Sequence, residues 1–263
     1  MENTNTNPYQ APEAELDAPV ESQNLSFGEP QKKPAGRGAQ WIKSAFQLFK
    51  QSPGGWILTM IVGFIIMMVT NFIPVLGSLF TLLTTYIWTA GILHGSREVD
   101  RGNKFKVGFL FAGFKLAFGK LMGLSVIIGL IGFAIAILCM GTLYIDVITG
   151  EKTADQLFVN QDAISIILPI LIMMALYIPL MMFVWFAPAL IIFHDMPIFK
   201  AMKESFNGCL KNIVPFLIYG IVALLLMIVA MIPVGLGLLI MVPVLYASMY
   251  TAYKDIYLRE ASE

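Results

Sequence analysis

Charged side chains are scarce in this chain of 263 residues. They make up 13% of it, while 57% of the residues are hydrophobic, against about 25% charged and about 45–50% apolar residues in soluble domains. A single water-soluble core of this length cannot hide so much apolar surface, so lipid must cover much of it. The composition therefore excludes a soluble globular protein and predicts an integral membrane protein.

Cysteine is nearly absent, and no secretory leader is visible. Cys139 and Cys209 fall at opposite membrane faces in the topology derived below, so we expect no disulfide. The first apolar stretch begins near residue 55, behind a polar segment without a cleavage pattern. We therefore expect the first membrane span to act as the insertion signal.

Catalytic motifs are also missing. The sequence contains no nucleotide-binding glycine loop, no HExxH pair and no GxSxG elbow. The one long segment outside the apolar stretches, residues 1–37, is rich in Asn, Pro, Glu, Gln and Ala, and its composition predicts a disordered cytoplasmic tail. We therefore expect no enzymatic activity, no cofactor and no nucleic-acid partner, and a membrane domain over residues 38–260.

What the chain does have is a series of long apolar stretches without charges. A transmembrane helix needs about 20 such residues. The fourth stretch is longer than that, and Pro169, Pro179 and Pro188 within it favour a kink. It is too short for two spans and a turn, so we predict one span there. The sequence therefore predicts an all-α membrane protein with six transmembrane helices, at residues 55–72, 73–95, 121–141, 163–193, 212–231 and 234–253.

The basic residues indicate the orientation of these spans. Of the 17 Lys and Arg residues, all but Lys152 fall on the same side of the six-span arrangement. The positive-inside rule assigns that side to the cytoplasm. We therefore expect a multi-pass protein of the bacterial inner membrane with both termini in the cytoplasm.

The segments before the first and fifth spans are built alike. In each, an apolar stripe at helical spacing lies opposite lysines: Trp41 and Phe49 oppose Lys43 and Lys50 in the first. The second has the same pattern, with Phe206 opposite Lys203 and Lys211. Both patterns predict amphipathic helices at the membrane interface.

The similarity continues into the helix pairs that follow. Ile73-Pro74-Val75 in the first pair matches Ile232-Pro233-Val234 in the last, and a weaker third copy begins near Asn103. We interpret this as an internal repeat of an interfacial helix followed by a transmembrane hairpin. The predicted modules cover approximately residues 38–101, 102–195 and 196–260.

Several short motifs carry a family resemblance. They are Gly38-Ala39-Gln40-Trp41-Ile42, Trp185-Phe186-Ala187-Pro188-Ala189-Leu190 and Tyr253-Lys254-Asp255-Ile256. Over about residues 38–257 the chain resembles a family of uncharacterised bacterial six-helix inner-membrane proteins. More distantly, its plan resembles the membrane domain found beside some glycerophosphodiester phosphodiesterases. The resemblance implies six helices and an inner-membrane location, and it supplies no catalytic residues.

The leading functional hypothesis is a non-enzymatic protein that engages lipids or other membrane proteins at its cytoplasmic face. Basic interfacial residues attract anionic headgroups by about 1 kcal/mol each. The residues expected to make these contacts are Trp41, Lys43, Phe49, Lys50, Lys203, Phe206 and Lys211.

The alternative is a facilitative transporter or channel for a small solute. Thr81, Thr85 and Thr89 would line its polar path, although hydroxyl groups in membrane helices more often bond to their own backbone. The central parts of the spans contain no ionisable residue, which argues against a proton- or ion-coupled mechanism.

A metal site is a weaker hypothesis. His94 and Glu98, at the end of the second span, fall on the same side as His194 and Asp195, at the end of the fourth. Imidazole and carboxylate groups are suitable ligands for zinc. Histidines are also favourable at the carboxyl ends of helices without any metal, and we expect that simpler role.

Overall fold

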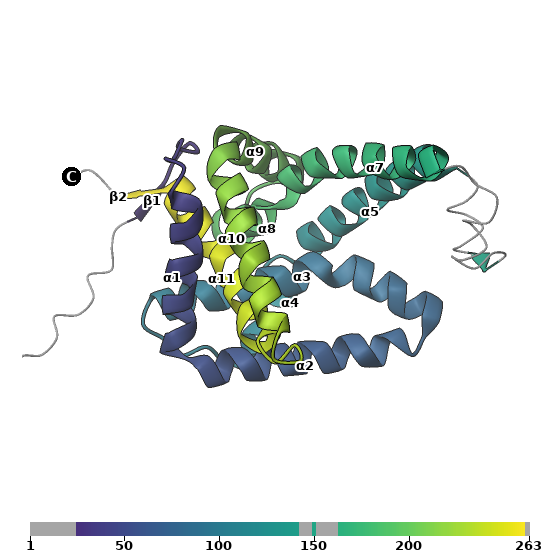
Figure 1. Cartoon of the computed structure of the whole chain (residues 1–263). Helices are drawn as coiled ribbons and strands as arrows, with labels where there is room; N and C mark the ends of the chain where they lie inside the picture. Colours follow the sequence, from purple (N-terminus) through teal and green to yellow (C-terminus); the bar gives the residue numbers. More distant parts are fainter. Residues whose placement is uncertain (1–24, 142–148, 151–162, 261–263) are drawn as a thin grey trace, which may run out of the picture.

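The computed structural model describes residues 25–141, 149–150 and 163–260, and most of these residues are helical (Figure 1). The predicted all-α class is therefore confirmed, apart from a short pairing of β1 (Leu25–Phe27) with β2 (Leu258–Glu260). The helices are α1 (Arg37–Gln51), α2 (Pro53–Asn71), α3 (Pro74–Asp100), the 3-10 helix η1 (Val107–Phe111), α4 (Ala112–Leu116), α5 (Phe118–Met140), α7 (Ala163–Val184), α8 (Ala187–His194), α9 (Ile198–Lys211), α10 (Ile213–Met231) and α11 (Leu238–Tyr257).

Five helical stretches of the described chain are long and apolar enough to cross a membrane: Pro53–Asn71, Val75–Asp100, Phe118–Cys139, Ile167–His194 and Ile213–Met231. They coincide with the first five predicted spans. The sixth predicted span, 234–253, overlaps α11, which is not among the five. Much of α11 is polar or aromatic, and its last turns carry Lys254 and Asp255. The count of six spans therefore stays a prediction.

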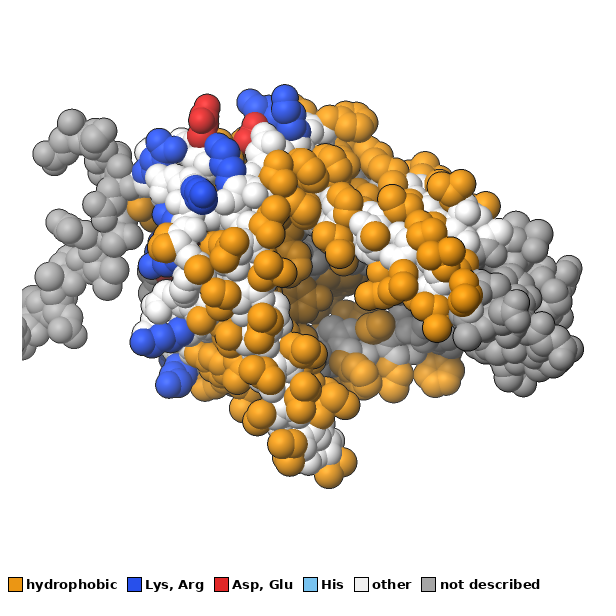
Figure 2. All heavy atoms as spheres, turned by 45° about the horizontal axis from the view of Figure 1, so that its top comes forward, with side chains coloured by type: hydrophobic (Ala, Val, Ile, Leu, Met, Phe, Trp, Pro, Cys, Tyr) orange, Lys and Arg blue, Asp and Glu red, His pale blue; other side chains and the backbone are white. Residues whose placement is uncertain are grey.

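Three pairs of helices extend from the centre of the molecule as arms: α2 with α3, α5 with α7, and α10 with α11 (Figure 1). In Figure 2, hydrophobic side chains cover the arms around a hollow, and Lys and Arg side chains gather at the opposite end. Phe64, Leu224 and Val234 are among the exposed apolar residues of the arms, and Val234 is 96% exposed. Such continuous apolar surface is expected in contact with lipid, not with water.

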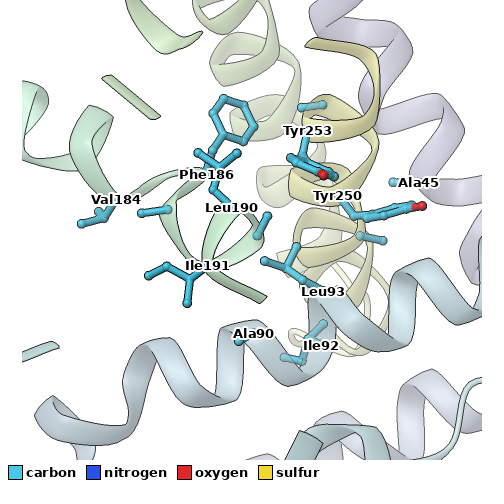
Figure 3. Close-up of a cluster of buried hydrophobic side chains, with 14 of the residues drawn as sticks. Ala45, Ala90, Ile92, Leu93, Val184, Phe186, Leu190, Ile191, Tyr250 and Tyr253 are labelled. Atoms are coloured by element: carbon cyan, nitrogen blue, oxygen red, sulfur yellow. The ribbon is translucent and has the colours of Figure 1, made fainter. Parts of the chain in front are cut away.

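The arms meet in a core made by α3, α11 and the short helix α8, which follows α7. Figure 3 shows Ala90, Ile92 and Leu93 of α3, Leu190 and Ile191 of α8, and Tyr250 and Tyr253 of α11 around a common centre. Helix α1 packs along α10 and α11 on the side away from the other two arms. The best-buried residues therefore lie near the basic end.

The predicted fourth span is interrupted. Helix α7 ends at Val184 and α8 begins at Ala187, and Pro188 occupies the first turn of α8, where its missing N–H costs nothing. The hydroxyl of Ser205, from α9, accepts a hydrogen bond from the Phe186 N–H (2.9 Å) and donates one to the Met182 carbonyl (2.7 Å). The kink expected from the prolines is therefore present as a break, stabilised by a residue of another helix.

The end of the predicted disordered tail needs a correction. Residues 1–24 lie outside the described residues, but residues 25–36, here called the N-terminal strap, are packed against the C-terminal end of the chain. The N–H groups of Gly28 and Gln31 donate to the carbonyls of Tyr257 and Ile256. The Asn212 side chain accepts from the Lys33 N–H at 2.8 Å. These hydrogen bonds offset the entropy cost of ordering the strap, which its few apolar side chains could not offset by burial.

A glycine allows the close approach of helices at two of the arm tips. A Cβ atom at Gly77 would overlap the carbonyl oxygen of Thr70, and one at Gly237 would overlap the backbone of Ala230. The two Ile-Pro-Val segments before these glycines nevertheless differ in backbone, because Val234 and Gly235 both have positive φ and Val75 lies in the first turn of α3.

Candidate functional site

The basic helices present lysines to solvent, as predicted. Lys43 and Lys50 on α1 and Lys203 on α9 are exposed. Lys211 is also exposed, and its ammonium group donates a hydrogen bond to the Pro30 carbonyl of the strap at 3.2 Å. Three of the four predicted lysines therefore extend outward, and the fourth also holds the strap.

The aromatic residues of the predicted contact set are buried or half-buried, unlike the lysines. Trp41 is 1% exposed and Phe49 is 7% exposed, so neither ring reaches a surface that lipid would contact. Phe206 is half-buried and stacks on Phe183 at 4.5 Å between ring centroids. The apolar stripes of α1 and α9 face the protein core. These are the faces that the sequence pattern assigned to the membrane interface.

One aromatic residue outside the predicted set is exposed on the basic surface. Phe199, in the first turn of α9, is 72% exposed and lies beside the exposed Lys200. The amphipathic pattern of this segment includes Phe199. Sequence spacing alone does not distinguish an apolar residue at the edge of the stripe from one at its centre.

Trp41 is held by a charged residue at the end of α11. Its indole N–H donates to the Asp255 carboxylate at 2.8 Å, and the Arg37 guanidinium donates to both oxygens of that carboxylate at 2.9 and 2.5 Å. Burial acts to raise the pKa of Asp255. The hydrogen bonds from Arg37 and Trp41 and the charge of Lys33 outweigh burial and hold this pKa below its usual value.

An apolar cavity of about 670 Å³ lies between α2, α3 and α11. Its lining includes Phe64, Leu239 and Tyr246, together with Thr81 and Thr85 of the predicted polar path. Thr89, the third residue of that path, is buried and is not part of the lining. The cavity lies between two arms, alongside the segments expected within the membrane.

The hydroxyls of Thr84, Thr85 and Thr89 are hydrogen-bonded within their own helix, α3. Thr85 donates to the Thr81 carbonyl at 2.6 Å, and Thr89 donates to the Thr85 carbonyl at 2.9 Å. Thr84 likewise donates to the Phe80 carbonyl at 2.7 Å and accepts from the Trp88 indole at 2.8 Å. These donors are therefore already used, which leaves the wall less able to replace the water of a polar solute.

Three of the four residues of the hypothetical metal site take part in separate polar interactions. Glu98 accepts hydrogen bonds from Arg101 and Asn103. His194 is hydrogen-bonded through Nε2 to the Tyr253 hydroxyl, and Asp195 pairs with Lys120 at 2.6 Å. Across residues 25–141, 149–150 and 163–260, no three His, Cys, Asp or Glu side chains form a group that could hold a metal ion.

A different polar cluster is assembled where α3, α8 and α11 converge. The Arg97 guanidinium lies over the ring of Phe193, 4.3 Å from its centroid. Next to it, Asp100 accepts hydrogen bonds from Tyr250 (2.8 Å) and Lys254 (2.6 Å). Arg97 is not among the site residues predicted from the sequence. Its only signal was its position, three residues after His94 in the polar last turns of a largely apolar helix.

Comparison with known proteins agrees with a membrane location. The chain is 27% identical over 224 residues to a probable inner membrane protein of Burkholderia thailandensis, and the match covers 81% of this chain and 80% of that protein. No family model matches the chain, and no solved structure matches it. With the five apolar helices, this similarity supports a multi-pass bacterial inner-membrane protein. The more distant likeness to the phosphodiesterase membrane domain stays a prediction.

Proposed function

We propose that this inner-membrane protein binds phospholipid, holding an acyl chain in the cavity between α2, α3 and α11 and attracting anionic headgroups to its basic cytoplasmic face. The observation that carries the proposal is the apolar cavity of about 670 Å³ between two lipid-facing arms. An apolar ligand fits such a lining, because most of the residues that face the cavity are apolar and the hydroxyls of Thr84 and Thr85 already donate to backbone carbonyls.

The bonding of the threonines favours lipid over a polar solute. A permeating solute needs donors and acceptors that replace its hydration. The hydroxyls of Thr81, Thr84 and Thr85 lie on a wall whose remaining residues are mainly apolar, and those of Thr84 and Thr85 donate to backbone carbonyls. The wall therefore resembles a surface for an acyl chain more than a hydrated path.

The proposal includes three modules, six spans and cytoplasmic termini. The three modules are supported by the geometry of the joints between each short helix and the following long one. Ser52 (φ −152°, ψ 57°), Ala117 (φ −158°, ψ 44°) and Asn212 (φ −124°, ψ 29°) adopt similar backbone angles before α2, α5 and α10. A joint of the same form at all three places is what an internal repeat predicts.

The test is to fill the cavity without changing its chemistry. Gly63 lines the cavity, and a Cβ there would meet only Leu110, at 3.9 Å. We expect Gly63→Leu to fold normally and to carry less bound phospholipid, as measured by mass spectrometry of extracts from the protein purified in detergent. The matched control is Gly220→Leu on α10, where nothing lies within 4 Å of the added Cβ.

Two results would contradict the proposal. One is an equal phospholipid content in wild type, Gly63→Leu and Gly220→Leu. The other is solute flux into proteoliposomes that is abolished when Thr81, Thr85 and Thr89 are changed to Val, because flux of that kind requires the polar path of the alternative hypothesis.

The headgroup contacts are tested separately on the basic face. Replacing Lys43, Lys50, Lys203 and Lys211 with Gln removes four charges, each contributing about 1 kcal/mol to attraction of an anionic surface. We expect the purified variant to retain less phosphatidylglycerol while its content of zwitterionic lipid is unchanged. Added salt should have the same effect on the wild type, because exposed charges are screened. Unchanged phosphatidylglycerol content would count against these contacts.

A further inference from the structure

Arg97 is a half-buried cation for which the described part of the chain supplies no counter-ion. Its Nε atom is buried and has no hydrogen-bond partner. Its guanidinium packs over the ring of Phe193. No carboxylate of the described residues forms an ion pair with it. Burying a charge is costly unless an opposite charge compensates it. The position therefore favours an anion supplied from outside the protein.

The nearby carboxylates are already used by other groups. Asp100 accepts from Tyr250 and from Lys254, and Glu98 accepts from Arg101 and Asn103. Each of these acids is paired with its own cation, Lys254 or Arg101. The positive charge of Arg97 is therefore the surplus of this cluster.

Two imidazoles lie near the same guanidinium. His94 precedes Arg97 by three residues on α3, so the two share a helix face. Its Nδ1 atom is buried without a partner. His194, at the end of α8, lies within electrostatic reach of Arg97 and is covered by the Phe27 ring of the strap, with ring centroids 4.1 Å apart. Helices α3 and α8 thus each bring an imidazole near the arginine, and the strap covers the one on α8, whose Nε2 is hydrogen-bonded to the Tyr253 hydroxyl.

The depth of Arg97 matches the phosphate layer of a membrane. From Val75, at the arm tip, to Arg97 the helix rises about 33 Å at 1.5 Å per residue, and the hydrocarbon core of a bilayer is about 30 Å thick. With the tip of α3 at one surface, Arg97 lies at the level of the headgroups on the other. That surface is the one where the basic residues gather.

We propose that Arg97, with His94 and His194, forms a binding site for a phosphate group. The terminal nitrogens of the guanidinium are not among its buried unpaired atoms, and arginine binds phosphate through parallel, charge-assisted hydrogen bonds. The phosphate belongs either to a phospholipid of the adjoining leaflet or to a small phosphate compound of the cytoplasm. The site goes beyond the proposed function, because it includes no residue of the acyl-chain cavity.

The test uses the full-length protein, freed of lipid in a neutral detergent. Three probes are titrated: inorganic phosphate, dihexanoyl phosphatidic acid and dihexanoylglycerol, which lacks phosphate. Binding is measured by equilibrium dialysis and by the shift of the thermal unfolding midpoint. We expect the two phosphate probes, and not dihexanoylglycerol, to bind and to raise the midpoint. Tighter binding of phosphatidic acid identifies a lipid headgroup as the source, and tighter binding of inorganic phosphate identifies a soluble compound.

Arg97→Gln should weaken phosphate binding by about tenfold or more, because a charge-assisted bidentate contact is lost. Arg101→Gln is the matched control, since Arg101 lies one turn later, is exposed and pairs with Glu98. Binding to this control should stay close to that of the wild type. Arg97→Lys, which keeps the charge and loses the planar fork, should bind with intermediate affinity.

Stability without ligand separates a binding role from a structural one. Because Arg97 has no ion-pair partner to lose among the described residues, Arg97→Gln should unfold at the wild-type midpoint or above it, whereas loss of a purely structural arginine would lower the midpoint. The inference is overturned if Arg97→Gln binds phosphate like the wild type, if the wild type binds neither phosphate probe, or if dihexanoylglycerol binds equally well. Gly63→Leu should still bind inorganic phosphate, because Gly63 lies in the acyl-chain cavity and not in the phosphate site. The two proposals can therefore fail independently of each other.

Discussion

At the scale of single residues, Asp255 joins three parts of the chain. Its carboxylate accepts hydrogen bonds from Arg37 and Trp41 of α1 and pairs with Lys33 of the strap at 3.2 Å. The side chain is 10% exposed. The motif around it carried the family resemblance, but the sequence did not indicate its partners, because Arg37 lies 218 positions away.

Replacing Asp255 with Asn should destabilise the protein by about 2 kcal/mol, the scale of a hydrogen bond to a charged group together with a broken ion pair. Thermal unfolding in detergent measures the effect. Asp195→Asn is the control, because its pair with Lys120 is formed by a carboxylate that is 92% exposed and should contribute much less. Equal unfolding midpoints for the two variants would contradict the assigned role.

The same carboxylate makes stability depend on acid. Because the pKa of Asp255 is lower in the folded protein than its usual value, its contribution is complete above the usual aspartate pKa. It is lost as pH falls through the folded pKa. The wild type should therefore lose more stability on acidification than Asp255→Asn does, in unfolding midpoints measured from neutral pH downward. Parallel curves for the two proteins would show that Asp255 is not responsible.

At the scale of helices, the break between α7 and α8 depends on Ser205 of α9. Ser205→Ala would leave the buried N–H of Phe186 without its acceptor, a loss of about 1–3 kcal/mol. Ser96→Ala is the matched control: Ser96 is equally buried but only donates to the Ile92 carbonyl of its own helix. We expect a clearly lower unfolding midpoint for Ser205→Ala alone. Similar losses in both variants would mean that the break is stabilised in another way.

The amphipathic helices illustrate what a periodic pattern can and cannot predict. The spacing of Trp41 and Phe49 opposite Lys43 and Lys50 correctly predicts a helix, which is α1. The spacing does not indicate what covers the apolar face, because the membrane interior and a protein core are both apolar. The structure covers that face with α10 and α11, where the Trp41 ring lies 5.2 Å from that of Phe216.

At the scale of the whole molecule, the predicted orientation can be tested with single cysteines. In a background with Cys139 and Cys209 changed to Ala, we expect Val234→Cys, at an arm tip, to react with a membrane-impermeant maleimide added to intact spheroplasts. Lys50→Cys, at the basic end, should react only after lysis, because the basic side is predicted to face the cytoplasm. Labelling is read as a mass shift on a gel, and the reverse pattern would invert the proposed topology.

Much of the architecture followed from sequence alone. The hydropathy of about 20 consecutive residues is a local property, so α2, α3, α5 and α10 begin and end within a few residues of the predicted spans. The prolines likewise indicated the break before α8. The sixth predicted stretch is not among the five span-capable helices of the described residues, because α11 mixes apolar residues with tyrosines and charges that suit the centre of a protein.

The sequence by itself determined the membrane class, most of the helices and the separation of basic from apolar regions, because these depend on neighbouring residues. Only the tertiary structure decided that the strap is ordered and that Trp41 is buried against Asp255. It also decided that Thr84 and Thr85 face a cavity with their hydroxyls already bonded, and that Arg97 has no ion-pair partner among the described residues. Each of these depends on which distant segments pack together, and local periodicity contains no information on that.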